Sequence, residues 1–205
     1  MNLPVYTIGH SSHSKEYFLE LLLANKITAV ADVRSTPFSK FSPQFNQEEI
    51  SSFLKSSGVA YVFLGRELGA RREEISCYTN NSVDFDKVRK APLFLDGIER
   101  LKKGLEKYRI ALLCVEKNPL DCHRTMLVSR HLVETGIPIS HILEDGTTIT
   151  HQKLLDELLV LSRLNKEDLF MSESEITNKA YEHQNERVAY KIAENNSEDK
   201  SGTSN

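Results

Sequence analysis

The sequence predicts an α/β protein: a single three-layer domain with a mostly parallel sheet of about five strands, helices on both faces and a polar C-terminal tail. Short, continuous apolar segments recur along the chain, as expected for strands that are buried on both faces. Segments with a helical spacing of apolar residues alternate with them, which is the order of βαβ units. Beyond residue 164 the apolar density falls, and Glu, Asn, Ser and Lys dominate.

The predicted strands are five apolar segments, at residues 4–9, 27–33, 60–64, 110–115 and 139–143. The predicted helices follow them, at residues 15–25, 46–57, 92–107, 121–135 and 150–164. Capping signals mark the helix starts at Ser14, Asp121 and Thr150, a capping-box pattern joins Asn46 to Glu49, and glycines end two helices at Gly58 and Gly136.

The charge of the chain is unevenly distributed. Residues 165–205 hold 5 of the 26 Lys and Arg residues and 9 of the 29 Asp and Glu residues. Residues 1–164 therefore hold 21 basic and 20 acidic residues. The larger part is nearly neutral and lacks the basic excess that drives bulk binding to nucleic acid. We therefore divide the chain into an α/β domain at residues 1–164 and a polar, acidic, partly helical or disordered tail at residues 165–205, with disorder expected from residue 195.

The sequence shows no sign of membrane insertion or export. No apolar run approaches the length of about 18 residues that a transmembrane helix needs. The first ten residues lack the basic and apolar regions of a signal peptide. The three cysteines are too few and too irregularly spaced for a disulfide framework. We expect a cytoplasmic protein that does not associate with membranes.

Residues 110–125 carry the densest chemistry of the chain. An apolar strand is followed by a short polar loop and then by the start of a helix, and such loops hold ligands in α/β proteins. This stretch places an acid, two thiols, an imidazole and a guanidinium within eleven residues, namely Cys114, Glu116, Cys122, His123 and Arg124.

Polar clusters follow four of the predicted strands, beginning at His10, Asp32, Gly65 and Glu116. In a parallel sheet the carboxyl ends of all strands lie along one edge. The sequence therefore predicts that these clusters converge on one crevice.

Two sets of candidate site residues follow from this convergence. The candidate catalytic groups, which supply proton transfer or a nucleophile, are His10, Asp32, Glu116 and Cys122. The candidate anion-binding groups are Ser11, Arg34, Ser39, His123 and Arg124. The basic loop at residues 65–72 extends the positive surface.

Structural interpretations of the same residues stay open. Arg34 and Arg124 could form salt bridges with Asp32 and Glu116, and Cys122 could be a small residue in a packed turn. A metal site would use Cys114, Cys122 and His123, with His10 or Glu116 as a fourth ligand. The Cys-x7-Cys-His spacing lacks the short Cys-x2-Cys element of structural zinc sites, and strand alternation directs Cys114 into the sheet packing. No metal is therefore predicted.

Several short segments, taken together and in order, resemble the family known as domain of unknown function 488. They are the residues at 7–11, 32–37 with Ser39, 64–65, 68–69, 113–116, 122–124, Gly136 and 141–142, and they span about residues 5 to 150. The resemblance implies a compact α/β domain and supplies no reaction. Lys40 stands where the family pattern favours Arg and Ala70 where it favours Gly; lysine keeps the charge but loses the bidentate fork.

The favoured hypothesis is an enzyme that hydrolyses or transfers a group on a phosphate-bearing substrate, a nucleotide or a nucleic-acid end, in the crevice at the carboxyl ends of the strands. One alternative is a binding module for the same ligands without catalysis. Another is a thiol-based redox or sulfur-transfer protein that uses Cys122. The sequence assigns no cofactor and no oligomeric state.

Overall fold

The computed structural model describes residues 4–165 and 170–192. A six-stranded sheet forms its centre, in the order β3-β2-β6-β1-β7-β8. The strands are β1 (Val5–Gly9), β2 (Ala29–Asp32), β3 (Ala60–Phe63), β6 (Ile110–Cys114), β7 (Ile139–Ile142) and β8 (Thr148–Thr150). The first five pair in parallel, and β8 pairs with β7 in the antiparallel direction. The predicted α/β class with a mostly parallel sheet is confirmed.

The prediction of five strands was one too few. The turn at residues 144–146 was expected, but the chain then folds back as β8 before the next helix begins. This strand has only three residues, two of them exposed threonines, so no apolar run distinguishes it from a loop.

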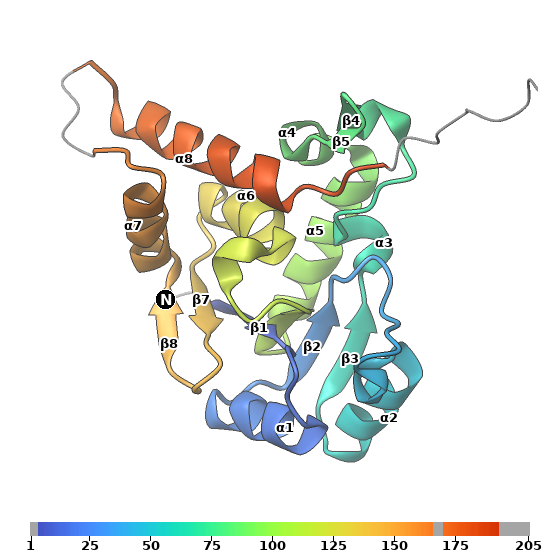
Figure 1. Ribbon diagram of the computed structural model, residues 1–205. Coiled ribbons are helices and arrows are strands. Elements are labelled where there is room, and N and C mark those ends of the chain that lie inside the picture. The colour runs from blue at the N-terminus through green and yellow to red at the C-terminus, as the bar shows by residue number, and fades with distance from the viewer. Residues whose placement is uncertain (1–3, 166–169, 193–205) are drawn as a thin grey trace, which may run out of the picture.

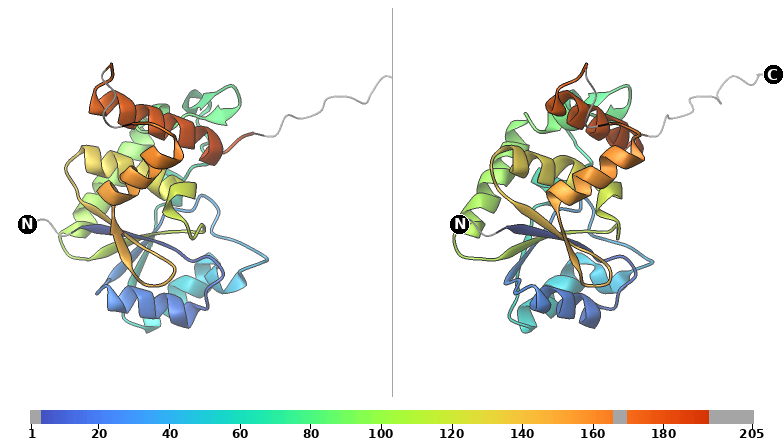
Figure 2. Two further views of the ribbon diagram at one scale, coloured as in Figure 1. Left: turned by 60° about the vertical axis from the view of Figure 1, so that its left-hand side comes forward. Right: turned by 90° about the vertical axis from the view of Figure 1, so that its left-hand side faces the viewer.

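The helices form two layers around the sheet (Figures 1 and 2). Helices α1 (Lys15–Ala24) and α2 (Gln47–Ser56) cover one face, and α5 (Pro92–Leu105), α6 (Arg130–Glu134) and α7 (His151–Leu161) lie on the other. Short elements complete the fold: α3 (Gly65–Leu68), α4 (Phe85–Val88), the hairpin β4 (Tyr78–Thr79) and β5 (Ser82–Val83), and 3₁₀ turns at Pro43–Phe45, Ile75–Cys77 and Pro119–Asp121. Over the described residues, no helix combines the length and apolar character needed to cross a membrane.

Strand β6 lies between β1 and β2, so it occupies the centre of the sheet. Its side chains alternate between two apolar clusters: Ile110 and Leu112 pack on the α5 side, whereas Ala111 and Leu113 pack on the α1 side. This alternation directs the next residue, Cys114, to the α5 and α6 side. The central position of β6 therefore brings residues 114–116 next to the ends of β1 and β2.

Two of the predicted helix caps are present, and two are replaced. Ser14 Oγ accepts a hydrogen bond from the Tyr17 N–H, and Thr150 caps α7 in the same way. The predicted capping box at Asn46 is absent because the Asn46 side chain accepts from the Ser39 N–H instead, at 2.7 Å. Asp121 is also not a helix cap, because it lies in a 3₁₀ turn that Asn118 caps.

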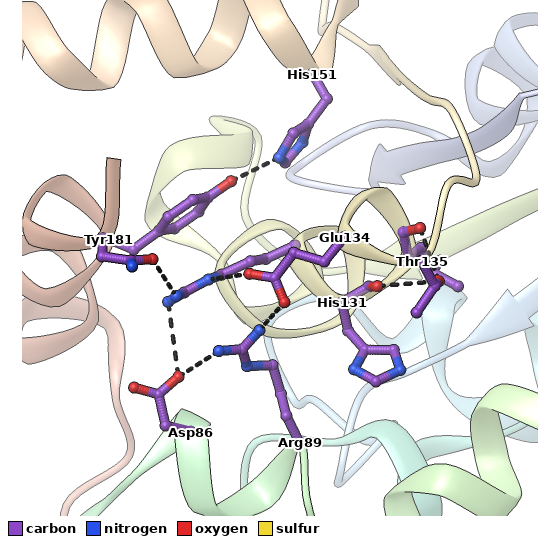
Figure 3. Close-up of polar contacts among 10 residues, drawn as sticks. Asp86, Arg89, His131, Glu134, Thr135, His151 and Tyr181 are labelled. Atoms are coloured by element: carbon purple, nitrogen blue, oxygen red, sulfur yellow. Dashed lines mark hydrogen bonds and ion pairs between the residues drawn. The ribbon is translucent and has the colours of Figure 1, made fainter. Parts of the chain in front are cut away.

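Helix α8 (Glu173–Val188) packs on the outside of α7 and of the helical segment before α6. Arg130 stacks on the Tyr181 ring at 4.4 Å and donates to Asn178. Nearby, Arg89 forms ion pairs with both Asp86 and Glu134 (Figure 3). The predicted tail thus includes a packed helix. The division of the chain at residue 164 stays a prediction, and the disorder expected from residue 195 lies outside the described residues.

A buried hydrogen-bonded chain connects β1 to α8. Thr7 Oγ1 lies 2.8 Å from His141 Nδ1, His141 Nε2 lies 3.1 Å from His151 Nδ1, and His151 Nε2 lies 2.7 Å from Tyr181 Oη. Burial lowers the pKa of His151 to about 4 and, with the neighbouring His151, also lowers the pKa of His141 well below its usual value. Both imidazoles are therefore neutral near pH 7.

We expect acid to weaken the fold through this chain. The unfolded protein protonates its histidines near the ordinary pKa of about 6.5, whereas folded His151 resists protonation down to about 4. The contribution of His151 to the free energy of unfolding is complete above pH 6.5 and is lost as the pH falls toward 4, by about 3 kcal/mol.

Denaturant unfolding between about pH 7.5 and about pH 4.5 checks this expectation. His151→Asn should give a flatter stability curve than the wild type, whereas substitution of the exposed His183 by Asn should leave the curve unchanged. Equal slopes for the wild type and His151→Asn would contradict the assignment.

Candidate functional site

A cavity of about 270 Å³ opens at the carboxyl ends of β2 and β6. Four segments of the chain line it. They are Arg34, Ser35 and Thr36 after β2, and Ala70 and Arg71 after α3. From the end of β6 onward come Cys114, Val115, Glu116, Asp121 and His123, and from the end of α8 onward come Val188 and Tyr190. In an open α/β sheet, ligands bind at this edge. A larger cavity of about 380 Å³ between β3 and α5 is lined mainly by apolar groups and holds no thiol, imidazole or carboxylate.

Cys114, Cys122 and His123 form a buried cluster at the floor of the cavity. The two sulfur atoms and one ring nitrogen of His123 all lie within 4.8 Å of one another. Cys114 Sγ lies 3.6 Å from His123 Nδ1 and 3.1 Å from Glu116 Oε2. The expectation that Cys114 turns into the sheet packing was wrong, because the face to which it points is the one where the next helical segment begins.

Cys122 occupies the position at the start of the helical segment that was predicted for Asp121 as its capping residue. Its backbone is extended, its carbonyl accepts from the Thr125 and Met126 N–H groups, and its Sγ accepts from the Arg124 N–H at 3.4 Å. The chain then continues as a π-helix, Arg124–Ser129, into α6. Burial raises the pKa of the Cys122 thiol well above its usual value, so this thiol is neutral near pH 7.

The orientation of the His123 ring is set by the main chain of β2. Its Nε2 lies 2.9 Å from the Val33 carbonyl oxygen, which can only accept, so Nε2 carries a proton. In the neutral ring Nδ1 therefore has a lone pair that faces the two sulfurs. Burial alone would lower the pKa of His123, but the hydrogen bond with Cys122 raises it above its usual value. A nitrogen held in this way can act as a base or as a metal ligand.

Glu116 and Asp121 both line the cavity, and Glu116 is the carboxylate that contacts the Cys114 thiol. Burial alone would raise the pKa of Glu116, but hydrogen bonds from Cys122 and Cys114 lower it below its usual value. The side chain is thus ionised near pH 7 and suited to accept a proton rather than to donate one.

Behind Arg34 lies a buried polar network. Asp32 accepts from Arg34 Nε at 2.9 Å, from Arg34 Nη2 at 2.6 Å and from Tyr61 Oη at 2.8 Å. Arg34 also donates to the Phe45 carbonyl. Burial and then the charge of Asp32 raise the pKa of Tyr61, so the phenol stays a hydrogen-bond donor. The salt bridge between Arg34 and Asp32, one of the two interpretations left open, is present, and Arg34 still reaches the cavity.

His10 belongs to the same network. Its Nδ1 donates to the Ser11 carbonyl and its Nε2 accepts from Arg34 Nη1 at 3.2 Å, while its ring stacks on Phe45. Burial, followed by the charge of Arg34, lowers the pKa of His10 to about 4. His10 is therefore a neutral residue that positions Arg34, at a distance from the cavity.

The family model described as "Domain of unknown function DUF488" matches residues 14–131, more than half of the chain. The chain belongs to the DUF488 family. The match includes most of the cavity residues but leaves out α8 and the residues that follow it, which supply Val188 and Tyr190. No curated protein and no solved structure matches the chain.

Arg124 holds the main chain of this DUF488 protein. Its side chain is fully buried, and its guanidinium donates to the Glu116 carbonyl at 2.6 Å and to the Lys117 carbonyl at 3.3 Å. The partner proposed in the salt-bridge interpretation, the Glu116 carboxylate, is not the group it contacts. Arg124 fixes the loop that carries Glu116 and does not line the cavity.

The cavity collects only part of the site predicted for the DUF488 protein. Glu116, Arg34 and His123 line it, whereas the other predicted residues, His10, Ser11, Asp32, Ser39, Cys122 and Arg124, do not. Sequence reasoning left Cys114 and Arg71 out of the assigned site, although the first was named as a metal ligand and the second as part of a basic loop. Tyr190 was missed, since nothing in a polar C-terminal segment indicates where it docks.

Proposed function

We propose that this DUF488 protein is an enzyme that hydrolyses or transfers a group on a phosphate-bearing substrate. The reaction takes place in the cavity at the carboxyl ends of β2 and β6. One observation carries the proposal: two arginines, two carboxylates, an imidazole and a thiol line the same cavity. Enzymes acting on phosphate esters need cations that hold the anion and a base that activates the attacking group.

The roles of the residues follow from their surroundings. Arg71 extends over the Tyr190 ring, at 4.8 Å, and is an exposed cation at the mouth, whereas Arg34 is fixed at the floor by Asp32 and His10. Both can donate to phosphate oxygens. Glu116 accepts a proton from the attacking water or hydroxyl. The roles of His10 and Asp32 are to hold Arg34 in place rather than to transfer protons.

The cavity size restricts the substrate. A volume of about 270 Å³ is below the range of about 300–1,000 Å³ typical of pockets that enclose drug-sized ligands. It accepts a phosphate with its sugar more readily than a complete nucleotide. A terminal phosphate on a nucleotide or on a nucleic-acid end, with the remainder outside, is the favoured substrate.

A thiol-based function is the second candidate, because Cys114 and Cys122 lie close enough for their sulfurs to interact. The raised pKa of Cys122 argues against a thiolate nucleophile at that position. Iodoacetamide labelling near pH 7 separates the two candidates, since slow labelling of Cys122 excludes its use as a nucleophile.

Binding and turnover test the proposal directly. A thermal-shift screen with inorganic phosphate, nucleotides and phosphorylated oligonucleotides identifies ligands, and mass spectrometry detects products. Arg71→Ala should weaken binding of the best ligand about tenfold, the loss of one charge-assisted hydrogen bond. Glu116→Gln should keep binding but lower turnover by about 10²–10⁴-fold.

The control for Arg71→Ala is Arg66→Ala, which removes the same charge from an exposed position outside this cavity. If a ligand stabilises the protein but no product forms, the protein is a binding module rather than an enzyme. The absence of stabilisation by every phosphate compound would reject the proposal.

A further inference from the structure

We propose that Cys114, Cys122 and His123 bind one zinc ion at the floor of the cavity and leave its fourth coordination position open. The three residues come from two elements, the end of β6 and the start of the helical segment before α6, and all three are buried. The binding of the ion depends on this cluster alone. Its use in catalysis rests on the function proposed above.

The distances fit a tetrahedral ion. Sulfur and nitrogen ligands held at about 2.3 Å and about 2.0–2.1 Å from zinc lie about 3.5 Å apart in a tetrahedral arrangement. Cys114 Sγ and Cys122 Sγ lie 3.6 Å and 4.0 Å from His123 Nδ1. Small side-chain rotations therefore suffice to bring the three atoms onto a common centre.

Groups around the cluster provide the supporting contacts of a metal site. Metal-bound histidines usually donate their other ring N–H to a carbonyl or carboxylate, and His123 Nε2–H already donates to the Val33 carbonyl. The Arg124 N–H donates to Cys122 Sγ, and this hydrogen bond would stabilise the negative charge of a metal-bound thiolate. Both contacts orient the ligands before an ion arrives.

The ligand set selects the ion. Two thiolates and an imidazole suit zinc, whereas magnesium and calcium require oxygen ligands. Two thiolates also neutralise the two charges of the ion, so the buried site carries no net charge when it is loaded. Other thiophilic ions bind such a set, which makes Co²⁺ a useful spectroscopic probe.

Three protein ligands with an open position are typical of catalytic rather than structural zinc. Two of the ligands, Cys114 and His123, line the cavity together with Glu116 and Arg71, so we expect the open position on the cavity side. A bound ion would lower the pKa of a coordinated water to about 7 and polarise a phosphoryl oxygen. Glu116 would then accept the proton of that water and remain outside the ligand set.

Metal content tests the site without an activity assay. The full-length chain, produced in zinc-supplemented medium and freed of any affinity tag, should contain one zinc ion per chain by mass spectrometric metal analysis. Cys114→Ser and Cys122→Ser should lose it. Cys77→Ser is the matched control, because Cys77 is a buried cysteine of the Ile75–Cys77 turn and lies outside the cluster. This variant should retain the ion.

Cobalt titration protects the test against variants that fail to fold. Wild-type protein stripped with a chelator under reducing conditions should give thiolate-to-cobalt charge-transfer bands and tetrahedral d–d bands that saturate at one equivalent. Glu116→Gln should bind cobalt equally well. A failure to bind would place the carboxylate among the ligands and overturn the open position.

Two results would overturn the metal site itself. The first is reduced wild-type protein without zinc and without a cobalt spectrum. The second is a disulfide between Cys114 and Cys122 that persists in reducing buffer. Turnover without bound metal would reject the catalytic use of zinc and leave the proposed function intact. A loaded site without turnover on any phosphate compound would support the metal site and reject the proposed function.

Discussion

Asp32→Asn should destabilise the protein by about 3–5 kcal/mol, because it leaves the buried guanidinium of Arg34 without its charge partner. Asp32 is completely buried, and it accepts hydrogen bonds from Arg34 and Tyr61. An amide can accept part of these hydrogen bonds but cannot compensate the positive charge. Urea unfolding monitored by circular dichroism measures the loss.

The exposed ion pair between Glu99 and Lys102 provides the control. Exposed pairs contribute little, so Glu99→Gln should leave the urea midpoint unchanged within error. A stable Asp32→Asn variant that only loses turnover would contradict the structural role and return Asp32 to the catalytic groups.

Gly9→Ala should destabilise the protein by about 3 kcal/mol and also impair the site. A Cβ atom at Gly9 would lie 1.8 Å from the Glu116 carbonyl oxygen and 2.7 Å from its carbonyl carbon. Both are main-chain atoms, and Arg124 Nη1, which donates to the same carbonyl, would lie 3.2 Å from the added Cβ. The clash can be relieved only by moving the loop that carries Glu116. Denaturant unfolding and ligand binding measure the two effects.

Gly104→Ala is the comparison for this glycine. Its Cβ would contact only the end of the Ile110 side chain, at 3.0 Å, and alanine is favoured over glycine in a helix. We expect a change of no more than about 1 kcal/mol in either direction. If Gly9→Ala behaved like Gly104→Ala, the close approach of β1 to the Glu116 loop would be refuted.

The fold was largely readable from local patterns. Continuous apolar runs identified the five parallel strands, and the caps at Ser14 and Thr150 lie where their side chains predicted. The pattern failed at β8, whose three residues are too polar, and at Asp121, where a 3₁₀ turn competed with the expected cap. The side chains of Asn118 and Cys122 decided that competition through contacts that no spacing rule describes.

The site was readable only in outline. Convergence of polar residues at one edge of the sheet follows from the geometry of parallel strands, so the cavity and its residues Arg34, Glu116 and His123 were within reach. The sequence could not predict which of the cationic side chains face the cavity. Arg34 and Arg124 both follow strands of the sheet, yet Arg34 lines the cavity and Arg124 does not.

By itself, the sequence determined the alternation of strands and helices, the edge at which polar groups gather and the supply of two thiols, an imidazole and two carboxylates within residues 114–123. The tertiary structure decided that Cys114 and Cys122 meet at His123 Nδ1, that Arg124 is used to hold a loop, and that α8 closes one wall of the cavity. Local patterns depend on neighbours along the chain, whereas these contacts depend on the order in which strands lie in the sheet. That order places β6 between β1 and β2. The sequence of a single segment carries no information about the order of the strands.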